Sequence, residues 1–209
     1  MGESARESVA TRDRLVTAAI RLFGAHGIEA TSLRALTEAA GANIAAVNYH
    51  FRSKEGLLRA AVEATMRQVN ERRRARLDGF EAGPRPPSAA DIVRAFVEPG
   101  LDLGGDGARF IGRMLGEPDP RVRQVFADQV DPVEGRYLAA LGAALPDRSP
   151  QDVRFAYTGM LGLLALHQSG AFTSVTWSTG APADPDGDTE RLIAFITAGA
   201  LAATAAPPE

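Results

Sequence analysis

Apolar residues recur at helical spacing along most of the chain, and glycine, proline and capping residues divide the pattern into segments. The first segment runs from Thr11 to about His26, with Thr11 as its N-cap and Gly27 as the residue that ends it. Residues 1–10 are polar, and we interpret them as a frayed tail. An arm in which Arg6 and Arg12 reach a groove beside the main binding site is the alternative that stays open.

The stretch from Thr31 to Lys54 predicts two short helices joined by a tight turn. Gly41 supplies the left-handed residue that commonly ends a helix, and Ser53 is placed to cap the helix that follows. The apolar stripes are Leu33, Leu36 and Ala40 in the first helix and Ile44, Val47 and Phe51 in the second. A short helix, a glycine-containing turn and a second short helix are typical of a helix-turn-helix.

Side chains that suit base edges lie away from the apolar stripe of the second short helix. We predict that Asn43, Ala46 and Asn48 face the major groove, because asparagine pairs with adenine through two hydrogen bonds and an alanine methyl packs on a thymine methyl. Some A·T pairs are therefore expected in each half-site. Arg34 is ambiguous between a base contact and a phosphate contact.

The sequence ATSLRALTEAAGANIAAVNYHFRSKEGLL, preceded by AAIRLFGAHGIEA, resembles the N-terminal DNA-binding domain of the TetR family of bacterial regulators. The resemblance covers about residues 10–60. The residues at the family's motif positions are Phe23, Gly27, Thr31, Ala40, Gly41, Tyr49, His50, Phe51, Lys54 and Leu57. Tyr49 and His50 resemble the family's phosphate-contacting pair, and we expect Thr31, Ser32, Tyr49, His50 and Lys54 to hold the DNA backbone. The chain departs from the family at Ile44, Ala45 and Ala46, where longer polar or charged residues are common.

The remainder of the chain continues the helical pattern. We predict a long helix from Lys54 to about Leu77, a linker over residues 81–88, and helices over residues 88–103, 108–116, 119–145, 150–169 and 188–204. Pro99 is expected to kink or end one helix, and a break or bend is expected near Val130–Pro132. The arginine run 72–76 is interpreted as a solvated helix end, and residues 170–187 as a long loop.

These segments indicate an all-α fold in two domains. Residues 1–55 form the N-terminal three-helix helix-turn-helix domain, and residues 56–209 form a C-terminal helical ligand-binding and dimerisation domain. The helix from Pro150 to Ser169 is apolar almost all round, so it must be buried on most sides. Gly159, Gly162, Gly199 and Ala203 would allow the last two helices to approach their symmetry mates in a homodimer. The alternative is that these helices build only the core of the monomer, and we favour both roles.

The family resemblance implies a small-molecule effector pocket among the middle helices. Candidate walls are Phe96, Phe110, Met114, Tyr157, Met160, Leu161 and Leu164, with Arg113 and His167 as candidate polar anchors. Methionine and aromatic side chains with few charges favour an apolar effector with one polar end.

Composition narrows the classes of function. There is no cysteine, which excludes disulfides, thiolate catalysis and cysteine zinc sites. The net charge of −3 divides into +2 over residues 1–60 and −5 over the rest, as expected when one end meets phosphate. Neither a membrane span nor a secretory signal is found, so a cytoplasmic location is expected. The three histidines lie far apart without a nucleophile motif or paired metal ligands, so neither an enzyme nor a cofactor or metal site is expected.

The predicted function is a homodimeric, ligand-responsive transcriptional repressor that binds a palindromic operator, with half-sites about 34–36 Å apart or a multiple of it. An effector-independent architectural DNA binder and an all-α carrier protein without DNA affinity remain alternatives. Activation instead of repression also stays open, because the sign depends on where the operator lies.

Overall fold

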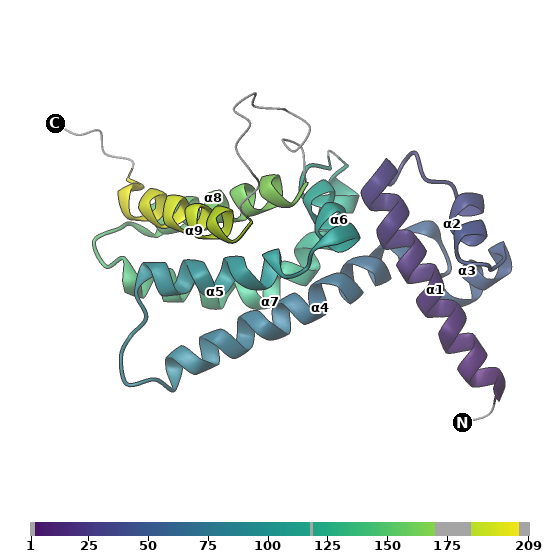
Figure 1. The fold of residues 1–209 in the computed structure, drawn as a ribbon, viewed down its shortest axis with the longest axis horizontal. Helices are drawn as coiled ribbons and strands as arrows, with labels where there is room; N and C mark the ends of the chain where they lie inside the picture. Colours follow the sequence, from purple (N-terminus) through teal and green to yellow (C-terminus); the bar gives the residue numbers. More distant parts are fainter. Residues whose placement is uncertain (1–2, 118, 170–184, 205–209) are drawn as a thin grey trace. The chain divides into compact units, whose positions relative to one another are not determined.

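The computed structural model describes residues 3–117, 119–169 and 185–204, which form nine α-helices and no strand (Figure 1). The all-α prediction is confirmed for this part of the chain. In order, the helices are α1 (Glu3–His26), α2 (Leu33–Ala39), α3 (Ile44–Phe51), α4 (Lys54–Glu81), α5 (Ala89–Leu101), α6 (Gly105–Leu115), α7 (Pro120–Ala144), α8 (Pro150–Ser169) and α9 (Pro185–Ala202). Each of these helices is too short or too polar to cross a lipid bilayer.

The chain divides into two compact units. The first unit contains residues 1–68 and 104–129, and the second contains residues 69–103 and 130–209. These limits differ from the predicted domains 1–55 and 56–209, because α6 packs against α1. The Phe23 and Phe110 rings stack with their centroids 6.3 Å apart, which ties a helix from the middle of the sequence to the first one.

The first unit contains the predicted helix-turn-helix. Ser32 begins α2 by accepting a hydrogen bond from the Ala35 N–H at 3.1 Å. Gly41 then turns the chain with φ of 58°, a conformation that residues with a Cβ rarely adopt. Val47 and Phe51 are buried on the inner side of α3, which contacts α1 and α2. The position of α3 is therefore set by Val47 and Phe51, whereas Ile44, predicted in the same apolar stripe, is half exposed to solvent.

The N-terminal part of α1 corrects the sequence interpretation. Residues 3–10 are helical, so the frayed tail predicted for residues 1–10 is wrong from Glu3 onward. Thr11 lies inside α1 and does not cap it, since its hydroxyl donates to the Glu7 carbonyl oxygen at 2.9 Å. A threonine can satisfy its hydroxyl on the preceding turn, so it is not a reliable helix start. Residues 1–2 lie outside the described residues.

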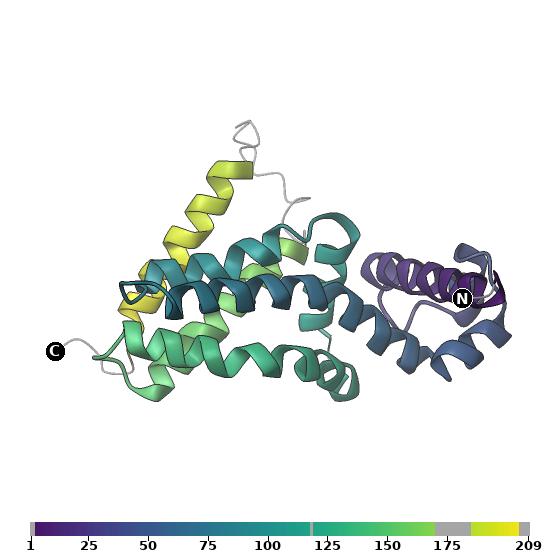
Figure 2. The same ribbon diagram turned by 90° about the horizontal axis from the view of Figure 1, so that it is seen from below.

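The second unit packs α5, α8 and α9 against one another, together with the later parts of α4 and α7 (Figure 2). Its core includes Phe96 of α5, Tyr137 of α7, Tyr157 and Leu164 of α8 and Ile196 of α9. The Phe96 ring meets the Tyr137 and Tyr157 rings edge-on, with centroid distances of 5.1 and 5.5 Å. These aromatic contacts fix α5 between α7 and α8 within this unit.

Capping residues mark the starts of α5 and α8. Ser88 and Asp91 form a capping box at the start of α5, with the Ser88 N–H donating to Asp91 at 2.9 Å. The hydrogen bonds from Ser88 hold the pKa of the Asp91 carboxyl below its usual value. The Ser149 hydroxyl and Asp152 form the equivalent pair before α8. Both helices begin where the sequence indicates.

Neither an end of a helix at Pro99 nor a break near residues 130–132 is observed. Pro99 lies inside α5, which continues to Leu101, and α7 continues without interruption through residues 130–132. The residues that follow Pro132 in α7 include the buried Val133 and Tyr137, so tertiary packing outweighs the hydrogen bond that a proline forfeits. Two helices also begin three residues earlier than predicted, α6 at Gly105 and α9 at Pro185. The loop predicted over residues 170–187 lies outside the described residues up to residue 184.

Candidate nucleic-acid interface and ligand site

The outer face of α3 is exposed to solvent. Asn48 and Tyr49 are exposed, and the Tyr49 side chain has a relative exposure of 79%. The Asn48 amide has no hydrogen-bond partner within the described residues. Ala45 is exposed beside them and Ala46 is partly buried. This face therefore offers one free amide, one phenol and small apolar side chains, a combination that fits the floor of a major groove.

Asn43 differs from the prediction in part. It is the N-cap of α3, and its Oδ1 accepts a hydrogen bond from the Ala46 N–H at 2.9 Å. A two-bond contact with adenine needs the amide oxygen as well as the amide nitrogen. Because the Asn43 oxygen already caps the helix, Asn48 is better placed than Asn43 to read a base.

The aromatic pair at the end of α3, Tyr49 and His50, lies next to the buried Phe51. The His50 ring is partly buried, with its centroid 4.9 Å from that of Tyr49 and 5.9 Å from that of Phe51. The Arg12 guanidinium carbon lies 5.6 Å from the Phe51 ring centroid. Arg12 therefore lies beside the predicted phosphate-contacting pair, on α1 and not on a tail.

The start of α2 carries Thr31 and Ser32, predicted to contact the DNA backbone, and Arg34, predicted to contact either a base or a phosphate. Ser32 and Arg34 are exposed, and Arg34 forms no ion pair within the described residues. Thr31 contradicts the prediction, because its side chain is only 3% exposed and its hydroxyl donates to the Gly27 carbonyl oxygen at 2.6 Å. Its side chain holds the turn between α1 and α2 and does not face a phosphate.

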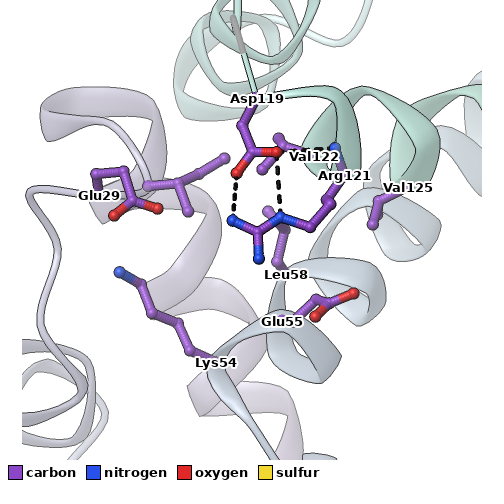
Figure 3. Close-up of a pocket in the computed structure, with 9 residues that line it drawn as sticks. Glu29, Lys54, Glu55, Leu58, Asp119, Arg121, Val122 and Val125 are labelled. Atoms are coloured by element: carbon purple, nitrogen blue, oxygen red, sulfur yellow. Dashed lines mark hydrogen bonds and ion pairs between the residues drawn. The ribbon is translucent and has the colours of Figure 1, made fainter.

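Lys54 begins α4 at the edge of a pocket of about 190 Å³ within the first unit (Figure 3). The side chain extends toward Glu29, and Arg121 lies across the pocket, held by Asp119 at 2.8 Å. These contacts with Arg121 keep the pKa of the Asp119 carboxyl below its usual value. Lys54 itself forms no ion pair in the described part of the chain, so its ammonium group is available to an anion from outside.

The predicted effector residues are divided between the two units. Phe96, Tyr157, Met160 and Leu164 are buried together in the core of the second unit, with Leu161 packed against them. Phe110 and Met114 are buried in the first unit. The predicted anchors also lie apart. Arg113 donates to the Gly24 carbonyl oxygen at 3.1 Å in the first unit, whereas His167 is exposed on α8.

A charged residue that the sequence interpretation missed lies inside the second unit. Arg73 of α4 is only 4% exposed, although the arginine run 72–76 was interpreted as solvated. Its guanidinium carbon lies 3.6 Å from the Phe96 ring centroid, and its Nε donates to the Phe96 carbonyl oxygen at 3.1 Å. Burial lowers the pKa of Arg73 to about 10, which still leaves it a cation at neutral pH. The signal was present in the periodicity, since residue 73 lies on the inner stripe between Val69 and Leu77.

The outward sides of α8 and α9 carry large apolar side chains. Phe155 is 72% exposed and Phe195 is 67% exposed, and Leu166 and Leu201 are also exposed. Gly159, Gly162 and Gly199 lie on the same sides, and a Cβ added at any of them would meet nothing within 4 Å. A surface of this kind is unusual for a monomer and typical of a face that another protein covers.

The fold and the exposed face of α3 define a helix-turn-helix DNA-binding regulator, and comparison with known proteins agrees. The model described as bacterial regulatory proteins of the tetR family matches residues 15–61. The model described as the tetracyclin repressor-like C-terminal domain matches residues 94–199. The chain therefore belongs to the TetR family of bacterial transcriptional regulators.

Two curated relatives and one solved structure show the extent of the similarity. The HTH-type transcriptional dual regulator CecR of Shigella flexneri is 36% identical over 198 residues, covering 89% of this chain and 87% of CecR. The nicotine-responsive transcriptional repressor HdnoR of Paenarthrobacter nicotinovorans is 35% identical over 96 residues, covering 46% of this chain and 44% of HdnoR. The chain spans half or less of the length of the other curated regulators that it matches. A tetR-family regulator from Rhodococcus RHA1 has the same fold, with a TM-score of 0.64, 20% identity and coverage of 91% of this chain and 96% of that one.

Proposed function

We propose that the protein is a homodimeric transcriptional repressor that binds a palindromic operator and is released from it by a small, largely apolar effector. The observation that carries this proposal is the outer face of α3, where Asn48 and Tyr49 are exposed on a helix anchored by the buried Val47 and Phe51. A rigid helix with a free amide is suited to reading base edges.

Contacts to phosphate would hold this helix in register. Ser32 and Arg34 at the start of α2, Tyr49 and His50 at the end of α3, and Lys54 at the start of α4 are the candidates, and all but the partly buried His50 and Lys54 are exposed. Arg12 is added to them because it stacks on Phe51 next to His50. Such contacts fix orientation and carry no sequence information directly.

One helix-turn-helix reads few base pairs, so specific binding calls for two copies related by a twofold axis. The exposed apolar sides of α8 and α9 are suited to supply that interface, with Phe155 and Phe195 as the largest side chains. The glycines on these sides would let two copies approach closely. Two pairs of helices would then form a four-helix bundle across the axis.

The effector would act through α4. This helix begins at Lys54 beside the DNA-binding face and contributes Arg73 and Leu77 to the core of the second unit. A ligand that enters the core around Phe96, Tyr157 and Leu164 would favour one position of α4 over another. To shift the ratio of the two positions of α4 from 1:99 to 99:1, the effector must bind one state more tightly than the other by about 5.5 kcal/mol. The name of HdnoR, which is responsive to nicotine, supports a small organic effector for this chain as well.

The decisive experiment selects bound sequences from a random pool of DNA duplexes with the purified full chain at a fixed salt concentration. The expected result is an inverted repeat with A·T pairs in each half-site, bound by a dimer. Binding to the selected duplex should weaken linearly in a plot of log affinity against log salt concentration, because phosphate contacts release counterions. If no duplex is retained even at low ionic strength, the proposed function is wrong.

A further inference from the structure

The buried guanidinium of Arg73 lacks the partner that a charge in this position requires. An isolated charge is costly in a protein interior unless it is paired and hydrogen-bonded. Arg73 nevertheless forms no ion pair with any carboxylate of the described residues, and the Phe96 carbonyl oxygen accepts only from its Nε. The two terminal nitrogens form no hydrogen bond within the described part of the chain, and they retain a small solvent exposure.

A second polar group beside the same ring is also unsatisfied. The Tyr157 hydroxyl oxygen is buried and has no hydrogen-bond partner within the described residues. Its ring lies 5.5 Å from that of Phe96, the ring on which Arg73 stacks. Tyr137, the other tyrosine of this cluster, differs, since its hydroxyl donates toward the carbonyl oxygens of Arg73 and Ala95.

The groups that Arg73 and Tyr157 present beside Phe96 are of one kind. A guanidinium donates only, and burial raises the pKa of the Tyr157 hydroxyl, so this group remains protonated and also donates. Two sets of donors without an acceptor are suited to an anion. The terminal nitrogens of an arginine match the two oxygens of a carboxylate, and stacking on Phe96 fixes the plane of the fork.

We propose that Arg73 and Tyr157 bind the carboxylate of the effector, which is an organic monocarboxylic acid with an apolar remainder. Arg73 would donate two hydrogen bonds to the carboxylate and Tyr157 one. The remainder of the molecule would contact Phe96, Met160 and Leu164, which are buried and apolar. A doubly charged phosphate is disfavoured, because a single cation would leave part of its charge uncompensated in an apolar core.

The packing around the site connects binding to the positions of the helices. A Cβ added at Gly100 would lie 2.8 Å from Leu164 Cδ2 and 3.4 Å from an Arg73 terminal nitrogen, so α4, α5 and α8 meet closely here. The Gln168 side chain also donates to the Gly100 carbonyl oxygen at 2.6 Å. A ligand that takes a place among these side chains must displace Leu164 and separate the helices, which is the change that an effector has to produce.

Binding of octanoate and 3-phenylpropionate to the full chain, measured by titration calorimetry at constant ionic strength, tests the proposal. Octanamide, 3-phenylpropionamide and acetate are the comparison ligands. At least one of the two acids should bind about tenfold or more tightly than its amide and than acetate, since a hydrogen-bonded charge is lost in the amide and the apolar contact is lost in acetate. If both acids bind no better than their amides, the proposal is overturned.

Variants locate the site. Arg73→Met and Tyr157→Phe should each weaken binding of the acid by about tenfold or more, and Arg72→Met should leave it unchanged. Arg72 is the matched control because it is the adjacent arginine, exposed and paired with Asp102. Tyr157→Phe removes only a hydroxyl without a partner, so this variant decides the matter if Arg73→Met does not fold. Unchanged binding in Tyr157→Phe and in a folded Arg73→Met would contradict the proposal.

The carboxylate site rests on the proposed function only where the acid is identified as the effector. A DNA-binding experiment tests the site and the proposed function separately. The acid should release wild-type protein from its selected duplex and leave Arg73→Met bound. Release of wild-type protein and Arg73→Met alike would refute the role of Arg73 while the regulator function stands. Failure of wild-type protein to bind any duplex would refute the proposed function, whereas the calorimetric result would still decide the carboxylate site.

Discussion

At the scale of single residues, the two asparagines around α3 have different environments although they belong to one short segment. Asn43 caps the helix through its Oδ1, whereas the Asn48 amide is exposed on the outer face. The same substitution at the two positions should therefore have different consequences for stability and for DNA binding.

Asn48→Ala should weaken binding to the selected operator without changing stability. A two-bond contact between asparagine and adenine discriminates by about 1–3 kcal/mol, and a dimer loses it in both half-sites, so the affinity should fall by roughly 30-fold or more at constant salt. The preference at one base pair of each half-site should also relax. Fluorescence anisotropy with operator variants measures both effects. An unchanged affinity and base preference would exclude Asn48 as a base-reading residue.

Asn43→Ala should instead lower the free energy of unfolding by about 1 kcal/mol, because the first turn of α3 loses its cap. Asn43→Ser keeps an oxygen that can cap and removes the amide donor, so its stability should stay close to that of wild type. Urea denaturation measures the stabilities and anisotropy measures the affinities. If Asn43→Ser binds DNA as wild type does, Asn43 acts only as a cap; a loss of affinity at wild-type stability would restore it as a base contact.

The sequence predicted residues of this site whose role depends on local geometry and missed those that depend on tertiary packing. Gly41 and the stripe ending at Phe51 locate α3 because turn and periodicity are local properties. Thr31 was misplaced because its hydroxyl satisfies a carbonyl four residues earlier, a choice that burial decides. Arg73 was missed because it was interpreted with its exposed neighbours, although its position in the helical period is an inner one.

At the scale of elements, the junction between α3 and α4 is the tightest point of the DNA-binding unit. Arg52 ends α3 with φ of 67°, the only positive φ at a non-glycine residue in the described part of the chain. A Cβ added at Gly56 in the first turn of α4 would lie 2.0 Å from the Phe51 carbonyl oxygen. Because the carbonyl belongs to the backbone and a Cβ is fixed to its own backbone, no side-chain movement can relieve the contact.

Gly56→Ala should therefore destabilise the protein by about 2–3 kcal/mol and tilt α3 away from its position. Gly79→Ala is the matched control in the same helix, since a Cβ there would meet nothing within 4 Å. It should stabilise the protein by about 0.5–1 kcal/mol, because alanine loses less backbone entropy in a helix than glycine does. Thermal denaturation and anisotropy with operator DNA check both variants. Equal stability changes at the two positions would show that the junction is not under steric constraint.

Helix existence was predictable and helix limits were predictable only where a cap marks them. The Ser88–Asp91 and Ser149–Asp152 pairs place the starts of α5 and α8 correctly. Both α5 and α7 were predicted over about these residues, but an end at Pro99 and a break near residues 130–132 do not occur, because buried residues on either side hold the helices together against the local preference of proline. Local propensity is a weak guide wherever packing opposes it.

At the scale of the whole molecule, the charge division between the two ends was predictable and the composition of the compact units was not. The excess of positive charge over residues 1–60 follows directly from the sequence. The assignment of α6 to the first unit depends on the contact between Phe23 and Phe110, which are 87 positions apart along the chain. A pairing of this kind leaves no periodic signal, so only the structure could show it.

The exposed apolar sides of α8 and α9 predict where two copies of the chain meet in a dimer. Phe195→Asp should convert the dimer to a monomer at micromolar concentration, because burying a phenylalanine contributes about 1.5–3 kcal/mol and a twofold interface loses it on both copies. Val9→Asp is the control, since Val9 is likewise an exposed apolar residue but lies on α1. Sedimentation velocity should show a monomer for the first variant and a dimer for the second, and circular dichroism should show the same helix content in both. Operator affinity should fall steeply in Phe195→Asp, because a monomer contacts only one half-site. If Phe195→Asp stays dimeric, the dimer interface lies elsewhere. If wild-type protein binds the palindrome with full affinity as a monomer, operator binding does not require a dimer.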